Sequence, residues 1–168
     1  VPTEGITAVT LADVAYAEGA GRKIKLLGRA IRRSDGRVCA YVAPHLVEGE
    51  NPLAGVEDVF NAITVKGDAI GDVMFYGRGA GKLPTASAKH LGSRKYLEWG
   101  PGGADVTASP DELESRWYVR AQVGAEAAKA LFPEASFLAR PGASEGESAF
   151  LTAAMKRPEL EEKLRGTQ

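Results

Sequence analysis

A polar turn between two apolar runs is the feature that most constrains this fold. The turn, SDGR, contains the dipeptide Asp35-Gly36 and joins the runs KIKLLGRAIR (23–32) and RVCAYVAPHL (37–46). Asp-Gly accepts the positive φ angles of a tight hairpin turn, so the two runs are predicted to pair as antiparallel strands. A second pair of runs, 60–65 and 73–76, flanks the turn KGDAIGD in the same way. The first half of the chain therefore predicts a sheet rich in antiparallel strands.

A helix is predicted before these strands, and a second pattern of elements follows them. Thr10 and Asp13 have the spacing of a capping box, and their helix is expected to run to about Glu18, before Gly19 and Gly21. Five later runs predict the order strand, helix, strand, strand, helix, at 116–123, 125–132, 135–140, 148–155 and 158–165. This order is typical of a ferredoxin-like sandwich that lacks its last strand.

The predicted fold class is α+β. Residues 1–99 are expected to form a mixed or antiparallel sheet with covering helices, and residues 115–168 a small ferredoxin-like domain. The stretch 100–114 is rich in Gly, Pro and Asp and is predicted to link the two domains. A chain of 168 residues is long enough for one domain and a small appendage.

Composition argues against several classes of function. The formal net charge is -1, so the composition does not indicate a basic surface that would bind nucleic acid. No apolar stretch approaches the roughly 20 residues that span a bilayer. Cys39 is the only cysteine, and His45 and His90 are the only histidines, so no metal site is predicted and Cys39 is expected to be buried. No signal peptide is visible, and a cytoplasmic location is expected. Because the sequence begins with Val1, we expect either a processed protein or a piece of a longer one.

The stretch FYGRGAGKLPTASA (75–88) leads from a predicted strand into a predicted helix with Thr85 as its N-cap. Gly77, Gly79 and Gly81 alternate in the turn between them, which permits either a tight connection or the close approach of a ligand to the main chain. The turn is not a P-loop, because no Gly-Lys-Ser/Thr follows at the required place. It is not the dinucleotide fingerprint either, because the preceding strand belongs to a hairpin.

Several motifs together resemble the homoserine dehydrogenase family: IKLLGRA after a glycine-terminated helix, NPLAGV, and NAITVKGDAIGDVMFYGRGAGKLPTASA. The resemblance covers about half the chain, residues 4–88. It implies the interconversion of homoserine and aspartate 4-semialdehyde with NADP or NAD, in threonine and methionine biosynthesis. It also implies that the cofactor contacts Gly79, Ala80 and above all Gly81, with Thr85 and Ser87 close by.

The resemblance further implies a homodimer, paired through the sheet that contains Leu53 and Asn61. The family's nucleotide-binding domain and the segment with its catalytic lysine are not in these residues, so no catalytic residue is predicted. We expect Lys23, Lys25 and Lys82 to be solvated and not to replace that lysine. The chain is therefore expected to be a fragment, inactive alone. The helix after TASA is also shorter than the family pattern.

The C-terminal pattern resembles the ACT-type domains of some family members, which bind a small amino acid such as threonine. Gly124 holds roughly the ligand-loop position, but the usual Asp-x-Pro-Gly turn is replaced by GAEAAKAL. A structural flap is the alternative. We expect one of Trp117 and Tyr118 in the core, and Arg116 and Arg120 facing water. The alternative function for the whole chain is a non-catalytic dimerisation or amino-acid-binding module.

Overall fold

The computed structural model describes residues 1–82 and 106–165, which fall in two compact units. Unit 1 combines Val1–Glu48 with Asp105–Gln168, and unit 2 is Gly49–Ala104. These units do not follow the sequence boundaries predicted near residues 99 and 115, because the C-terminal elements pack with the first helix and hairpin. The assignment of residues 115–168 as an ACT-type domain stays a prediction.

Unit 1 begins with the predicted helix and hairpin, α1 (Leu11–Gly19), β1 (Arg22–Arg32) and β2 (Val38–Glu48). Gly21, with a φ of 66°, follows the end of α1, and Gly36, with a φ of 83°, occupies the hairpin turn. Both glycines therefore stand where the backbone needs a positive φ, as the sequence predicted. The strands pair antiparallel along their whole length, from Arg22 opposite Glu48 to Arg32 opposite Val38.

The C-terminal module, which we define as residues 118–165, has the predicted element order. It comprises β5 (Tyr118–Ala121), α3 (Ala125–Leu131), β6 (Ser136–Leu138), β7 (Ser148–Leu151) and α4 (Arg157–Arg165), preceded by the 3-10 turn η2 (Pro110–Glu112). The sheet order is β5-β7-β6, with β7 antiparallel to both neighbours. The last strand of the module, β7, thus lies between β5 and β6, which α3 connects. This is the arrangement of a split β-α-β fold.

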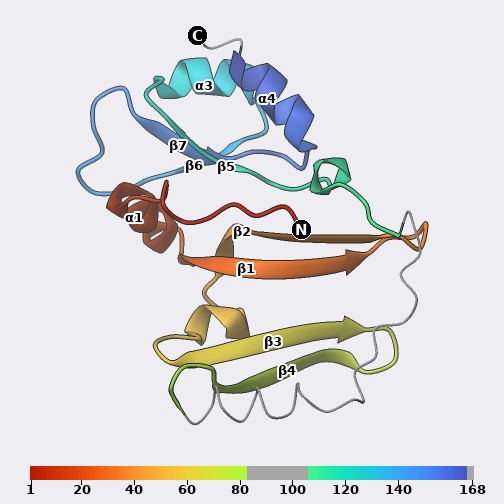
Figure 1. The fold of residues 1–168 in the computed structure, drawn as a ribbon. Coiled ribbons are helices and arrows are strands. Elements are labelled where there is room, and N and C mark those ends of the chain that lie inside the picture. The colour runs from red at the N-terminus through yellow and green to blue at the C-terminus, as the bar shows by residue number, and fades with distance from the viewer. Residues whose placement is uncertain (83–105, 166–168) are drawn as a thin grey trace. The chain divides into compact units, whose positions relative to one another are not determined.

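The core of the C-terminal module lies between its sheet and the helices α3 and α4 (Figure 1). Val119 and Phe150 come from the sheet, Phe132 from the end of α3 and Leu160 from α4. Trp117 packs against this core, and its indole N–H donates to the backbone oxygen of Met155 at 2.9 Å. Tyr118 contacts α1 instead, because successive residues of a strand point to opposite faces of the sheet. The expectation that one of these two aromatic residues belongs to the core is therefore confirmed.

A buried carboxylate joins α1 to the C-terminal module. Asp13 is only 7% exposed, and its carboxylate accepts hydrogen bonds from Arg120 Nε at 2.7 Å and the Tyr118 hydroxyl at 2.8 Å. The Thr10 backbone N–H donates to this carboxylate, which is one of the hydrogen bonds of the predicted capping box. The Thr10 hydroxyl donates to the same carboxylate. Arg120 is exposed, as expected, and its guanidinium also donates hydrogen bonds to Asp13 and Thr10 at the N-terminus of α1.

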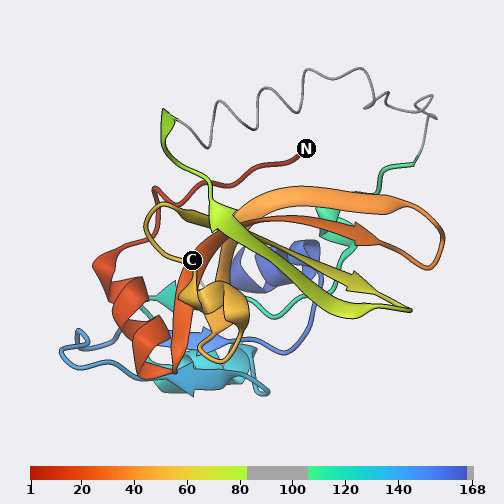
Figure 2. The same ribbon diagram turned by 90° about the horizontal axis from the view of Figure 1, so that it is seen from below.

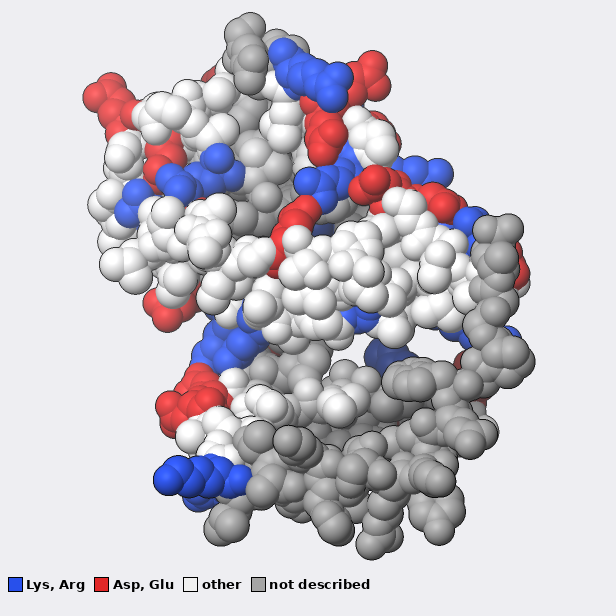
Figure 3. Space-filling model, in the orientation of Figure 1, with Lys and Arg blue, Asp and Glu red and all other residues white. Residues whose placement is uncertain are grey.

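A second carboxylate extends this cluster. Glu147 accepts from Arg120 at 3.1 Å, from Arg140 at 2.8 Å and from the Tyr16 hydroxyl at 2.9 Å. Acidic and basic side chains lie next to one another on the face of unit 1 in Figure 3, and are not separated by sign. We name Asp13, Tyr16, Arg120, Arg140 and Glu147 the α1 ion cluster.

The helix α1 also approaches the C-terminal module through its last residue. A Cβ added to Gly19 would lie 2.6 Å from the backbone oxygen of Ala139. We expect Gly19→Ala to lower the free energy of unfolding by about 1–2 kcal/mol, because the steric cost exceeds the gain in helix propensity. Urea denaturation measures the difference, with Gly5→Ala as the control because a Cβ there meets nothing within 4 Å. Equal stabilities for the two variants would contradict the contact.

Unit 2 contains η1 (Pro52–Gly55) and a second antiparallel hairpin, β3 (Phe60–Gly67) and β4 (Gly71–Arg78), seen as a twisted ribbon in Figure 2. Gly71, with a φ of 71°, closes the predicted turn. The predicted α+β class is confirmed in its coarse form. Among the described residues, every named strand pairs antiparallel, and the parallel pairings are the isolated bridges Thr3–Val42 and Val38–Thr107.

Candidate functional site

The glycine turn follows directly from β4 in unit 2. The backbone N–H groups of Gly79 and Ala80 both donate to the carbonyl oxygen of Val59, at 2.9 and 3.2 Å. This shared acceptor ties the turn to the residue that precedes β3. Gly79, Ala80 and Gly81, the three predicted cofactor contacts, are all exposed.

The three alternating glycines of the turn serve different purposes. A Cβ at Gly77 would meet nothing within 4 Å, whereas one at Gly79 would overlap the side-chain amide of Asn61. Gly81 has a φ of 121°, a backbone conformation that side chains rarely permit. Close packing therefore explains Gly79, and backbone geometry explains Gly81. Asn61, predicted as a dimer residue, is thus also the neighbour that shapes the turn.

The geometry limits what this turn can hold. Each backbone amide has one N–H, and those of Gly79 and Ala80 are already used by Val59. They are therefore not available as a cradle for a phosphate group. The bare, exposed main chain instead suits a flat ring that packs against it without a side chain intervening.

An aromatic stack lies beside the turn, and the sequence reasoning missed it. The rings of Phe60 and Tyr76 are parallel within 8°, with centroids 4.9 Å apart. The Arg78 guanidinium carbon lies 5.5 Å from the centroid of Phe60. The available signal was the hairpin register, which pairs Phe60 with Arg78 and places Tyr76 two residues earlier on the same face.

The other residues singled out from the sequence lie as follows. Lys23 and Lys82 are exposed, whereas Lys25 is half-buried opposite His45, so full solvation of Lys25 was a wrong expectation. Gly124 is exposed at the N-cap of α3. Thr85 and Ser87 lie outside the described residues. Cys39 is fully buried, as predicted, and burial raises the pKa of its thiol.

In residues 1–82 and 106–165, no group of three or more His, Cys, Asp or Glu side chains is placed to hold a metal ion. Within the same ranges, no helix has the length and apolar character needed to cross a membrane.

Comparison with known proteins places the turn in a family context. The family model described as homoserine dehydrogenase matches residues 1–89, which include the whole glycine turn. A homoserine dehydrogenase of Pseudomonas aeruginosa is 46% identical over 86 residues, which are 51% of this chain and 20% of that protein. One from Mycobacterium tuberculosis is 42% identical over 136 residues, covering 71% of this chain and 30% of the relative.

Solved structures extend the similarity to nearly the whole chain. The crystal structure of a homoserine dehydrogenase from Thiobacillus denitrificans matches 97% of this chain with a TM-score of 0.70 and 27% identity. That of the S. aureus enzyme at pH 6.5 matches 97% with a TM-score of 0.65 and 34% identity. The chain spans 43% of each of these structures, and 20% to 30% of the curated relatives above.

The matched residues include the hairpins, η1 and the glycine turn, in the order in which the sequence motifs predicted them. With the family model covering more than half of its length, the chain belongs to the homoserine dehydrogenase family.

Proposed function

We propose that this protein acts as a homoserine dehydrogenase, interconverting L-homoserine and L-aspartate 4-semialdehyde with NADP or NAD in threonine and methionine biosynthesis. The observation that carries the proposal is the family match over residues 1–89, which includes an exposed glycine turn with the required bare main chain. The chain covers less than half of its solved relatives, so the activity is proposed for the protein to which these residues contribute.

In this proposal Gly79, Ala80 and Gly81 contact the nicotinamide ring. A bound NADP or NAD supplies the hydride chemistry, which requires a nearby substrate carbonyl and a proton donor. The turn offers no side chain that carries a proton, so its role is to position the ring by shape. The hydrogen bonds to Val59 support this role, because they fix the turn before any ligand arrives.

The proposal includes a homodimer formed through unit 2. Ile63 and Phe75 lie opposite each other on β3 and β4 and are 65% and 62% exposed. An isolated two-stranded hairpin is marginally stable in water, and a second copy would cover this apolar pair. The molecular mass in solution, measured by light scattering, tests the dimer, and a monomer at high concentration would contradict it. A threonine effector and a cytoplasmic location remain predictions.

A segment exchange tests the proposed activity. Residues 1–89 would replace the matching segment of the P. aeruginosa relative, with which this chain shares 46% identity over 86 residues. We expect the hybrid to oxidise homoserine with NADP or NAD, and the purified chain of 168 residues to show no turnover alone. A folded hybrid without activity would favour the non-catalytic alternative. Turnover by the chain alone would show that it carries its own acid and coenzyme site.

A further inference from the structure

The side-chain amide of Asn61 lies against the glycine turn without a hydrogen-bond partner. A Cβ at Gly79 would lie 3.0 Å from Asn61 Oδ1 and closer still to its Nδ2. Asn61 is exposed, and among the side-chain hydrogen bonds of residues 1–82 and 106–165 none includes its amide. The N–H donors and the carbonyl acceptor of this amide are therefore available to a ligand beside the turn.

The register of the hairpin explains why this amide stays unpaired. Asn61 stands opposite Gly77, and its neighbours on the same face of β3 and β4 include Ile63 and Phe75. None of these neighbours, nor Gly79, has a polar side-chain group that could pair with the amide. A Cβ at Gly77 would meet nothing within 4 Å, so there is open space next to Asn61. A ligand can reach the amide from that side.

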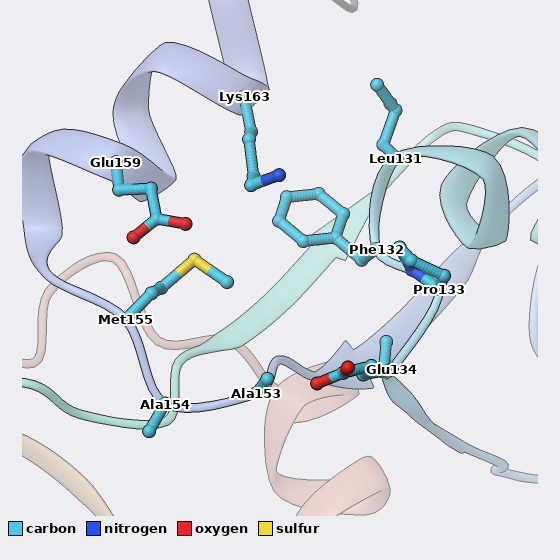
Figure 4. Close-up of a pocket in the computed structure, with 10 residues that line it drawn as sticks. Leu131, Phe132, Pro133, Glu134, Ala153, Ala154, Met155, Glu159 and Lys163 are labelled. Atoms are coloured by element: carbon cyan, nitrogen blue, oxygen red, sulfur yellow. The ribbon is translucent and has the colours of Figure 1, made fainter.

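The pocket of about 230 Å³ in Figure 4 does not contribute to this place. It lies in unit 1, and its lining includes Phe132, Met155 and Lys163. The glycine turn belongs to unit 2, and Gly79, Ala80 and Gly81 are exposed. A flat ring on such a surface can rotate in its own plane unless a polar group fixes its orientation.

We propose that Asn61 binds the coenzyme through the carboxamide of its nicotinamide ring, an inference that rests on the proposed function. This carboxamide, like the side chain of asparagine, is a primary amide with an acceptor oxygen and an N–H donor, so the two groups form a pair of hydrogen bonds. The ring lies on the main chain of the turn, and Asn61 fixes its rotation. Hydride transfer requires C4 of the ring to face the substrate carbonyl, so this rotation decides whether the bound coenzyme is productive.

A second copy of the chain is the other candidate partner for the amide. Asn61 shares its face of the hairpin with Ile63 and Phe75, the apolar pair proposed for the dimer. The apolar pair, however, lies two residues further along each strand, whereas Asn61 contacts Gly79 of the turn. We therefore assign the amide to the coenzyme, and the mass of Asn61→Asp in solution tests the alternative.

The side-chain amide NMR signals of the purified chain test the contact without enzyme activity. Asn51 and Asn61 are the only asparagines, and Asn51 is the internal control because its Oδ1 already accepts from the Leu53 N–H. On titration with nicotinamide mononucleotide, we expect the Asn61 signals to shift together with the backbone signals of Gly79 and Gly81, while those of Asn51 stay unchanged. Shifts in the turn without a shift at Asn61 would overturn this inference alone. No shift in the turn would remove the proposed coenzyme contact and this inference with it.

Asn61→Asp in the hybrid enzyme tests the pattern of hydrogen bonds. The natural coenzyme is compared with its 3-acetylpyridine analogue, whose acetyl group accepts a hydrogen bond but donates none. Because an aspartate also accepts without donating, we expect kcat/KM to fall about tenfold with the natural coenzyme and at least about 100-fold with the analogue, each relative to the unmodified hybrid. A residue that only shapes the turn would give equal factors for both coenzymes, and that result would overturn the proposal.

Thr64→Asp is the matched control, because it adds the same charge at an exposed position on the other face of β3. We expect it to leave kcat/KM for both coenzymes within about twofold of the unmodified hybrid. Melting temperatures show whether each variant folds, and light scattering gives its mass. Asn61→Asp is expected to keep the mass of the unmodified protein. A dimer that this substitution converts to a monomer would assign the amide to the second copy and overturn the proposal.

Discussion

Replacing Asp13 with alanine is expected to lower the free energy of unfolding by about 2–4 kcal/mol. The Asp13 carboxylate is buried, and its loss leaves the Tyr118 hydroxyl and the Thr10 amide without their acceptor. Removing one partner of a buried ion pair costs about 3–5 kcal/mol, and the lower figure here reflects that Arg120 keeps Glu147 and some contact with water. Chemical denaturation followed by circular dichroism measures the change.

Asp72→Ala provides the matched control for this prediction. Asp72 forms an ion pair with Lys66 at 3.3 Å, but both side chains are largely exposed, so we expect a change below about 0.5 kcal/mol. A similar, small effect for both variants would show that the α1 ion cluster contributes little. Comparing the two variants therefore separates the effect of burying an ion pair from the effect of merely having one.

The same carboxylate predicts a loss of stability in acid. Burial alone would raise the pKa of Asp13, but hydrogen bonds from Arg120, Thr10 and Tyr118 outweigh it and lower the pKa to about 2. A carboxyl group whose pKa is lowered on folding stabilises the protein above its unfolded value, near 4. This contribution should disappear as the pH falls from about 4 toward 2. The stability difference between the wild type and Asp13→Ala should shrink over the same range, and a constant difference would contradict the assignment.

Gly81→Asp in the hybrid enzyme is expected to reduce kcat/KM for the coenzyme by at least about 100-fold. Two causes combine: the φ of 121° strains any residue with a Cβ, and a carboxylate would occupy and charge the surface proposed for the nicotinamide ring. Steady-state kinetics with varied coenzyme concentration measures the effect. Gly81→Ala, which adds strain without charge, should give a smaller loss of about tenfold.

Gly77→Ala is the control for the turn, because its Cβ would enter open space in a backbone that does not require glycine. We expect it to keep the kinetics of the unmodified hybrid. Melting temperatures of all three variants separate lost folding from lost coenzyme contact. A Gly81→Asp hybrid with normal stability and an unchanged KM and kcat would remove the turn from the coenzyme site.

Much of the local structure followed from the sequence. Asp35-Gly36 predicted the hairpin β1–β2, and the spacing of Thr10 and Asp13 predicted the start of α1, because both signals act over a few residues. The family motifs predicted the order of elements through the glycine turn. The strand ends were less well predicted, since β7 stops at Leu151 and not near residue 155.

The contacts between distant residues were decided by the tertiary structure. Asp13 and Arg120 are 107 positions apart, and nothing in the local pattern of either residue names the other. The overlap of Gly79 with Asn61 likewise depends on the register of β3 and β4, which a glycine in isolation does not report. The sequence alone determined where the chain turns and which family it resembles, because backbone preferences and motifs are local. Only the folded structure decided which charges are buried together and which glycines are needed for space, because both depend on what long-range packing brings alongside them.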